Sequence, residues 1–504
     1  MNVLTRIAAG GRACLRAWRR IPRAGRACFV IAFVNVAVWS VIIPPFQVPD
    51  EISHFGYAQY LAETGSPPPQ GPGAPYSVQE SDALLGLDWG TVIGNPSARG
   101  VITVPQDQEL RALLRGNPSP LGAGGVTAAT NQPPLYYALE AIPYWLSPSN
   151  DILTRLELMR LLSALMAAGT VLAVFMFLRE LMPGTPWAWT VGALMVAFQP
   201  MFDFIGAGVQ GDNLLYLASA LTFFALARAW RRGLTVRRAA LIGGVLALGM
   251  LAKLTFLALV PGAGLALLVL AWRALPAGRR ATLRMLGTAV AVAAAPVLLY
   301  ALLNVTVWNR NSAFAGGLAT VTSAGSGPAA TITWRATLDY TWELYLPKLW
   351  FMNHLYFGQW PLWPTWFGGA VGRFGWLDYS FPTWVYSDLQ DVVYALAALG
   401  VIGLVRARHA IRGMLGLFAC FGVMALGLLG IIGYLGIRYT ANTGDPFPQA
   451  RYLFPLLAFY ALAIVLATKG LPRRWAPVLG GLLVVLAMAH CLFAETLTIS
   501  RYYG

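Results

Sequence analysis

The chain of 504 residues is too apolar for a water-soluble protein: 57% of its residues are hydrophobic, 11% are charged, and its mean hydropathy is +0.59. A soluble domain carries about 25% charged residues. The net charge of +15 does not indicate nucleic-acid binding, because the basic residues fall in short runs between apolar segments, as they do in orienting loops. The cysteines fit neither a disulfide framework nor a zinc site, since they are scattered at Cys14, Cys28, Cys420 and Cys491.

The first apolar segment, predicted as a span over 27–45, follows an arginine-rich head. No small-x-small cleavage pattern follows it, and Pro44-Pro45-Phe46 comes instead. The pattern therefore predicts an uncleaved signal anchor. The basic residues of the head are Arg6, Arg12, Arg16, Arg19, Arg20, Arg23 and Arg26.

Apolar runs long enough to cross a bilayer recur through the rest of the chain and predict an all-α polytopic membrane protein. With the anchor they make eleven spans, at 27–45, 157–179, 187–206, 212–230, 239–252, 254–272, 283–303, 386–405, 413–433, 453–468 and 475–495. In this threading the basic loops share the side of the N-terminus, which the positive-inside rule makes cytoplasmic, and only Glu180 of the 21 acidic residues falls there. We expect a cytoplasmic segment 1–26, a membrane domain 27–495 and an outer C-terminal tail 496–504.

Two outer segments, 46–156 and 304–385, are too long to be simple connectors and predict functional loops. In the first, the apolar run that ends at Leu146 is too short to cross, so we expect an interfacial or re-entrant helix. The second is rich in tryptophan, which favours either the headgroup level or a sugar-binding surface. Its tryptophans are Trp334, Trp342, Trp350, Trp360, Trp363, Trp366, Trp376 and Trp384.

The acidic pair Asp50-Glu51 directly follows the first span, where ionised groups are costly to hold and therefore indicate function. If a helix starts here, Asp50 and His54 share one face and Glu51 points elsewhere, so that one carboxylate acts while the other holds a partner or metal. We predict Asp50 and Glu51 as catalytic and His54 as substrate-binding. One alternative is a solvated acidic loop that caps a helix. A divalent ion, Mg or Mn, held by Asp50, Glu51 and His54 is another.

The motif Pro49-Asp50-Glu51-x-x-His54-Phe55 resembles the DUF2142 family of bacterial multi-pass membrane proteins. Phe374-Gly375-Trp376-Leu377-Asp378 and Gln449-Ala450-Arg451-Tyr452-Leu453-Phe454-Pro455 are similar to further blocks of that family, with Ala450 in place of its usual glycine. Together the blocks reach from about residue 27 to about residue 470.

That family in turn resembles the GT-C glycosyltransferases, an analogy of architecture. The resemblance implies transfer of a sugar from a polyprenyl-phosphate donor to a glycan, lipid or protein acceptor, on the outer face of a bacterial plasma membrane. It also implies that an acidic residue in the first outer loop, here Asp50 or Glu51, lies at the catalytic centre. Such a carboxylate would take the proton of the acceptor hydroxyl, while cationic groups meet the charge of the departing lipid phosphate.

Lys253 and Arg451 are the candidate cations. Lys253 falls between two short apolar halves, and lysine-containing hairpins of related GT-C enzymes contact the lipid phosphate. Arg451 opens a span beside Tyr452, and Arg438 lies nearby. The alternatives are a lysine that snorkels to the interface and arginines that serve as interfacial anchors.

The remaining candidates are polar residues at the outer ends of predicted spans. Asp212 and Asn213 open one span and Asp203 ends another, where they would bind sugar hydroxyls, although helix capping by Asp212 explains its motif equally well. Gln132 beside Pro133-Pro134 would shape an acceptor cleft. Asp378 would either touch substrate or fix its own loop.

Other functions stay open at this point. A transporter or flippase for lipid-linked saccharides usually has charges near the midplane and repeated halves, and this chain has neither. A ligase that moves whole glycans from a polyprenyl diphosphate is a further alternative, as is a scaffold without chemistry.

Overall fold

The computed structural model describes residues 18–69, 76–101, 103–116, 118–122, 128–310, 332–352, 355–444 and 447–504. The first part of the basic head, with Arg6, Arg12, Arg16 and Cys14, lies outside these residues. Within them the only regular structure besides helices is one short hairpin, β1 (Arg373–Phe374) with β2 (Tyr379–Ser380), whose antiparallel register pairs Arg373 with Ser380.

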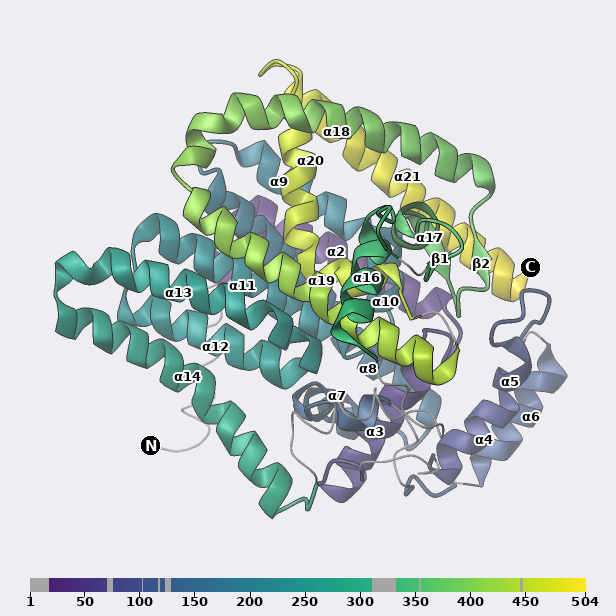
Figure 1. Cartoon of the computed structure of the whole chain (residues 1–504). Helices are drawn as coiled ribbons and strands as arrows, with labels where there is room; N and C mark the ends of the chain where they lie inside the picture. Colours follow the sequence, from purple (N-terminus) through teal and green to yellow (C-terminus); the bar gives the residue numbers. More distant parts are fainter. Residues whose placement is uncertain are drawn as a thin grey trace.

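The long helices form the body of the molecule (Figure 1). They are α2 (Arg23–Ile42), α8 (Ile152–Leu181), α11 (Asp212–Arg232), α12 (Val236–Ala252), α13 (Val260–Ala274), α14 (Arg279–Thr306), α18 (Thr383–Arg412), α19 (Leu415–Thr443), α20 (Leu457–Thr468) and α21 (Ala476–Tyr503). A bent pair, α9 (Pro186–Ala197) and α10 (Pro200–Gly206), joins them.

Shorter helices lie in the segments 46–156 and 304–385 and at the ends of the long helices. They are α3 (Glu51–Thr64), α4 (Val78–Gly86), α5 (Trp89–Val92), α6 (Val104–Arg115), η1 (Ala128–Asn131), α7 (Leu135–Leu146), η2 (Leu254–Leu259), η3 (Leu275–Ala277), α16 (Trp334–Tyr345), η4 (Leu362–Phe367), α17 (Gly368–Gly372) and η5 (Ala450–Leu456). The predicted interfacial helix that ends at Leu146 is therefore present as α7, with 12 residues.

The predicted count of eleven spans is not confirmed by helix length and hydropathy alone. Nine helical stretches of the described residues are long and apolar enough to cross a membrane, or ten if the bent pair α9–α10 is one span. The pair was predicted as one run over 187–206, but it bends by 62° because Phe198 and Gln199 interrupt the helix and Pro200 restarts it. The predicted span 239–252 is present as α12. It is not counted among the nine, because its 17 residues are fewer than the 18 required for a candidate span.

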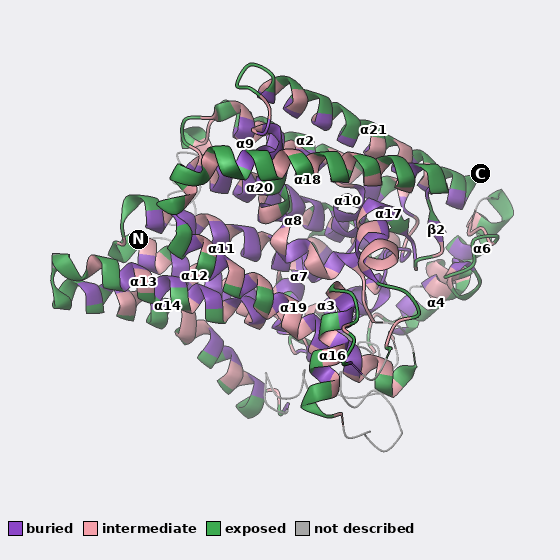
Figure 2. Cartoon of the chain, turned by 45° about the horizontal axis from the view of Figure 1, so that its top comes forward, coloured by how far each residue is buried: buried purple, intermediate pink, exposed green. Residues whose placement is uncertain are grey.

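The core lies where α8 packs against α2 and α11, and α11 packs against α12. Figure 2 shows this centre as mostly buried, whereas α18 is mostly exposed. Only 6% of the apolar window of α18 and 17% of that of α14 is buried, as expected for helices that face lipid. The chain is therefore a multi-pass membrane protein.

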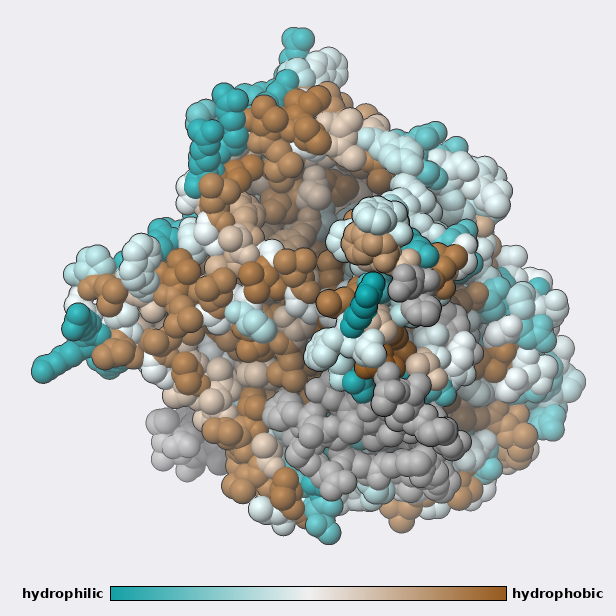
Figure 3. Space-filling view, in the orientation of Figure 1, coloured by the Kyte–Doolittle hydropathy of each residue, from teal (hydrophilic) through white to brown (hydrophobic). Residues whose placement is uncertain are grey.

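Helices α18 and α19 diverge from their connection near Gly413. Helix α20 packs mainly along α18, and it meets α19 where the rings of Phe459 and Phe421 lie 5.6 Å apart. The close approach of α18 to α20 requires Gly403, because a Cβ there would lie 1.9 Å from the carbonyl oxygen of Leu466. Figure 3 shows that the surface between α18 and α19 is recessed and predominantly apolar.

Candidate active site

Asp50 and Glu51 point in opposite directions from the start of α3. Asp50 is the N-cap residue and has a left-handed backbone, with φ of 64°, so its side chain is directed away from that of Glu51. Its Oδ2 accepts a hydrogen bond of 2.6 Å from Nη2 of Arg451, 401 residues further along the chain. The Asp50 side chain is 45% exposed and that of Arg451 is 6% exposed. The structure thus places an accessible carboxylate against a buried cation.

The charges around Asp50 favour its ionised form. Burial raises the pKa of the carboxyl, but the opposing influences, led by the charge and hydrogen bond of Arg451 and including the charge of Lys253, outweigh burial, and its pKa lies below the ordinary value for aspartate. Asp50 is therefore ionised at neutral pH and able to accept a proton.

Glu51 is completely enclosed and is paired with Arg160 of α8. Nε and Nη2 of Arg160 donate to its two carboxylate oxygens at 2.8 and 2.6 Å. The backbone N–H of Val209 donates to Oε1 as well, at 3.0 Å. Both oxygens are thus occupied, and Glu51 fixes the start of α3 rather than facing the accessible side of Asp50.

Arg160 also fixes the end of α2. Its guanidinium donates to the carbonyl oxygens of Ser40, Ile43 and Pro44 at 2.8–3.0 Å. The sequence analysis did not single out Arg160, although an arginine inside the apolar run 157–179 was a signal that could have done so. The arrangement ties the end of α2 to the acidic motif.

Lys253 is turned inward onto Asp212. Its Nζ lies 2.7 Å from Oδ1 of Asp212, and its side chain is 17% exposed, so the snorkelling alternative does not describe it. The capping alternative for Asp212 is also wrong, because Gly211 occupies the N-cap position of α11 and no side chain caps it. The side-chain oxygen of Gln132 accepts from the N–H of Leu254 at 3.1 Å and so holds the adjoining turn.

His54 lies between the charged pairs and a stack of tyrosines. Its Nδ1 is 2.9 Å from the hydroxyl of Tyr137, whose ring in turn stacks on Tyr57 at 3.6 Å between centroids. Burial, followed by the charge of Lys253, lowers the pKa of His54 to about 4. His54 is therefore neutral at physiological pH and contributes shape and a hydrogen bond rather than charge.

Arg451 has N–H groups without a hydrogen-bond partner among the described residues. Its Nε and Nη1 atoms are buried, and neither has a hydrogen-bond partner among those residues. The Tyr216 hydroxyl donates to its backbone carbonyl at 3.0 Å, and its guanidinium lies 5.4 Å from the ring centre of Tyr452. Buried unpaired N–H groups of an arginine are unusual, and an anionic ligand would satisfy them.

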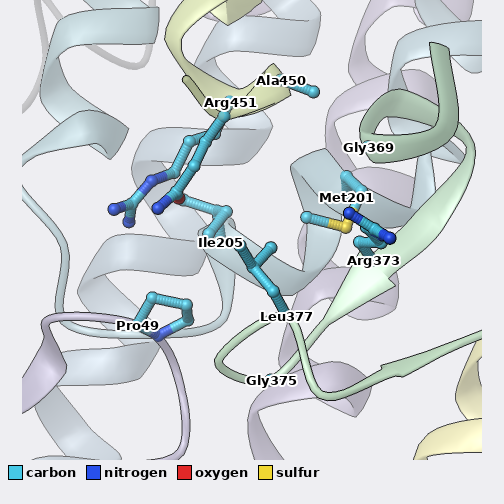
Figure 4. A pocket seen from close by; sticks show the side chains of 10 residues that line it. Pro49, Met201, Ile205, Gly369, Arg373, Gly375, Leu377, Ala450 and Arg451 are labelled. Atoms are coloured by element: carbon cyan, nitrogen blue, oxygen red, sulfur yellow. The ribbon is translucent and has the colours of Figure 1, made fainter. Parts of the chain in front are cut away.

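A pocket adjoins this arginine. Figure 4 shows Arg451 and Arg373 lining it on opposite sides, from η5 and β1. It is lined by Pro49, Met201, Ile205, Gly369, Arg373, Gly375, Leu377, Gln449, Ala450 and Arg451. The three sequence blocks around Asp50, Phe374 and Arg451 therefore meet at one place.

The remaining predicted residues have structural contacts. Asn213 donates to the carbonyl of Gly208 at 3.1 Å, and Asp203 is fully buried, with its Oδ2 3.6 Å from Sγ of Cys491. Arg438 lies over the ring of Tyr434, and no hydrogen bond or ion pair joins it to Asp50 or Arg451 in the described part of the chain.

Asp378 fixes its own loop, as the alternative interpretation held. Its Oδ1 accepts from the N–H of Trp376 at 2.9 Å, and its Oδ2 pairs with Arg501 at 2.8 Å. Gly375 is required in this turn, because its φ is 59° and a Cβ would lie 2.0 Å from Oδ1 of Asp378. The loop that lines the pocket is thereby held to the C-terminal helix α21.

The alternative of a divalent ion held by Asp50, Glu51 and His54 does not fit the positions of these side chains. Asp50 faces Arg451, whereas both oxygens of Glu51 face Arg160, so the carboxylates do not converge with His54. No group of three or more His, Cys, Asp or Glu side chains suited to a metal occurs among the residues that the structure describes.

Glu140 of α7 is a further buried carboxyl, and it gives a testable pH dependence. Burial raises its pKa to about 8, although Ser163 donates a hydrogen bond of 2.9 Å to it. Between the ordinary glutamate pKa, about 4.3, and 8, the unfolded chain has lost a proton that the folded chain keeps, so stability falls as pH rises. We expect the melting midpoint in detergent to fall between pH 6.5 and 8, and to fall less in Glu140→Gln.

Below pH 6.5, His54 has the opposite effect on the pH dependence of stability. With a pKa of about 4 when folded and about 6.5 when unfolded, His54 makes stability rise with pH between those values. Parallel melting curves for wild type and Glu140→Gln above pH 6.5 would show that Glu140 is ionised in the folded protein.

A family model described as "Predicted membrane protein (DUF2142)" matches residues 33–460. The chain belongs to the DUF2142 family. No protein of curated function matches this DUF2142 protein in sequence.

Two kinds of solved structure resemble the DUF2142 protein in fold. The oligosaccharyltransferase AglB of Archaeoglobus fulgidus, tethered to an acceptor peptide, has 13% identity and a TM-score of 0.45, with 95% of this chain and 55% of that one covered. The arabinosyltransferase EmbB of Mycobacterium smegmatis has 15% identity and a TM-score of 0.38, with 97% and 42% covered. The chain thus spans about half the length of these proteins, and at such TM-scores the likeness carries no further argument.

Proposed function

We propose that this DUF2142 protein is a membrane glycosyltransferase that moves a sugar from a polyprenyl-phosphate donor to a hydroxyl acceptor on the outer face of the membrane. The observation that carries the proposal is the Asp50–Arg451 pair, in which an accessible carboxylate contacts an arginine with two buried, unpaired N–H groups. The family's resemblance to GT-C enzymes in architecture, with an acidic residue in the first long loop, supports the same chemistry.

Asp50 would act as the general base. The acceptor oxygen attacks the anomeric carbon, its proton passes to Asp50, and the bond between that carbon and the phosphate oxygen breaks with its electron pair leaving on the phosphate. Glu51 cannot share this role in the present arrangement, because Arg160 and Val209 occupy its oxygens.

Arg451 and Lys253 would meet the charge that develops on the phosphate. Protonation of Asp50 removes the negative partner of Arg451 at the moment when the leaving group gains charge, so the guanidinium becomes free to stabilise it. Lys253 acts on Asp50 electrostatically as well, and its partner Asp212 keeps it turned inward.

The apolar recess between α18 and α19 would hold the polyprenyl chain. It lies among helices with lipid-facing surfaces (Figure 3), and η5, which carries Arg451, leads directly into α20. A long hydrocarbon chain could therefore remain in the membrane while its phosphate reaches Arg451.

The proposal is tested with purified protein in lipid nanodiscs and a synthetic polyprenyl-phosphate sugar, by measuring the release of polyprenyl phosphate. We expect Arg451→Gln to reduce release by roughly 10²–10³-fold, the usual effect of removing one donor to a developing oxyanion. The control is Arg335→Gln, since Arg335 lies in α16 with a side chain that is 68% exposed, and it should stay within about twofold of wild type.

Other outcomes would identify a different function. Release only from a polyprenyl-diphosphate glycan would indicate a ligase. An intact donor that changes leaflet without loss of sugar would indicate a flippase. Equal activity of Arg451→Gln and wild type would contradict the assigned phosphate site.

A further inference from the structure

A second pocket lies at the opposite ends of the helices that form the candidate active site. Helix α8 carries Arg160 near its start, and α11 starts at Asp212; their other ends meet the start of α9 around this pocket. The 21 residues of α11 extend about 30 Å, the thickness of a bilayer's hydrocarbon region. The pocket is lined by Arg179, Glu180, Pro183, Trp189, Arg231 and Arg232.

The pocket has an excess of positive charge. Glu180 is its acidic member, and it is already paired with Arg228 at 3.2 Å and with Arg232 at 2.8 Å. Arg179 and Arg231 line the pocket with no acidic partner among the described residues. An anionic ligand would therefore find two uncompensated guanidinium groups in a preformed cavity.

The pocket also has an aromatic wall that is held in place. The indole N–H of Trp189 donates to the carbonyl of Met182 at 2.8 Å, and the guanidinium of Arg179 lies 5.8 Å from its ring centre. Tryptophan rings favour the headgroup level of a bilayer. Arginines that line a pocket between helix ends bind phosphate groups well, because their N–H groups match phosphate oxygens.

We infer that this pocket binds the phosphate headgroup of an anionic phospholipid. The phosphate would lie between Arg179 and Arg231, and the acyl chains would follow the apolar surfaces of the neighbouring helices into the bilayer. The lipid is favoured over a soluble phosphate because the pocket lies where helices of membrane-spanning length end, beside an indole. The inference does not depend on the proposed reaction.

The test measures lipid binding by native mass spectrometry, with phosphatidylglycerol and phosphatidylcholine titrated into delipidated protein. We expect wild type to prefer phosphatidylglycerol, and the double variant Arg179→Gln/Arg231→Gln to lose roughly tenfold in affinity for it. The matched control is Arg279→Gln/Arg280→Gln, an exposed basic pair at the start of α14, which should lose less than about twofold.

Each alternative result overturns the inference. Equal losses in the two double variants would mean general attraction to a basic surface. Competition by millimolar inorganic phosphate with the same variant dependence would identify a soluble-phosphate site. If the double variant fails to fold, Arg231→Gln alone replaces it, since Arg231 is exposed and carries no salt bridge in the described residues; an unchanged lipid preference in that variant would exclude the site.

Discussion

Asp50→Asn is expected to reduce sugar transfer by roughly 10²–10⁴-fold, the usual contribution of a general base, while the protein keeps its fold. Asparagine has nearly the same shape and also tolerates the left-handed backbone at this position, where φ is 64°. The loss should appear as a lower kcat, since the amide cannot accept the proton in the transition state. The measurement is single-turnover release of polyprenyl phosphate, with a melting curve to verify folding.

The matched control is Asp388→Asn, an exposed carboxylate near the start of α18, which should have wild-type activity. If Asp50→Asn retained more than about a tenth of wild-type activity, Asp50 would not be the base.

Arg160→Met is expected to destabilise the protein by about 3–5 kcal/mol, because it leaves the Glu51 carboxylate buried without its partner. The carbonyl groups of Ser40, Ile43 and Pro44 would lose their donor in the same variant. Denaturant unfolding in detergent measures the loss. The double variant Arg160→Met/Glu51→Leu should be less destabilised than the sum of its two single variants, since no unpaired charge remains.

Additive effects in this double-mutant cycle would mean that the two side chains do not interact. An Arg160→Met protein with wild-type stability would contradict the buried ion pair itself.

The sequence alone predicted a multi-pass membrane protein of the DUF2142 family. It also predicted that the motifs around Asp50 and Arg451 lie close together. Asp50 and Arg451 were both expected at outer ends of spans, and positions at the same ends of packed helices lie close together. Helix register separated the side chains of Asp50 and Glu51, but it could not show which of the two carboxylates is accessible. That difference depends on Arg160, which lies 109 residues from Glu51 and pairs with it in the interior.

Hydropathy also failed to predict the break between α9 and α10. The run 187–206 is continuously apolar except for a few positions, but the bend between α9 and α10 comes from the Gln199-Pro200 step. Likewise, aspartate is a common helix-capping residue, so the sequence suggested a cap at Asp212. Its actual partner, Lys253, follows α12, and the pattern of residues within α11 cannot reveal a contact with another helix.

Helix α11 has a consequence for the membranes in which this protein can work. Asp212 at one end pairs with Lys253 in the candidate active site, and Arg232 at the other end lines the second pocket, so a helix of about 30 Å sets the separation between them. Both polar groups can reach the two aqueous boundaries together only where the lipid tails match that length. In shorter or longer lipids the helix must tilt or the bilayer must deform, so acyl-chain length becomes a property to which both ends of the molecule respond.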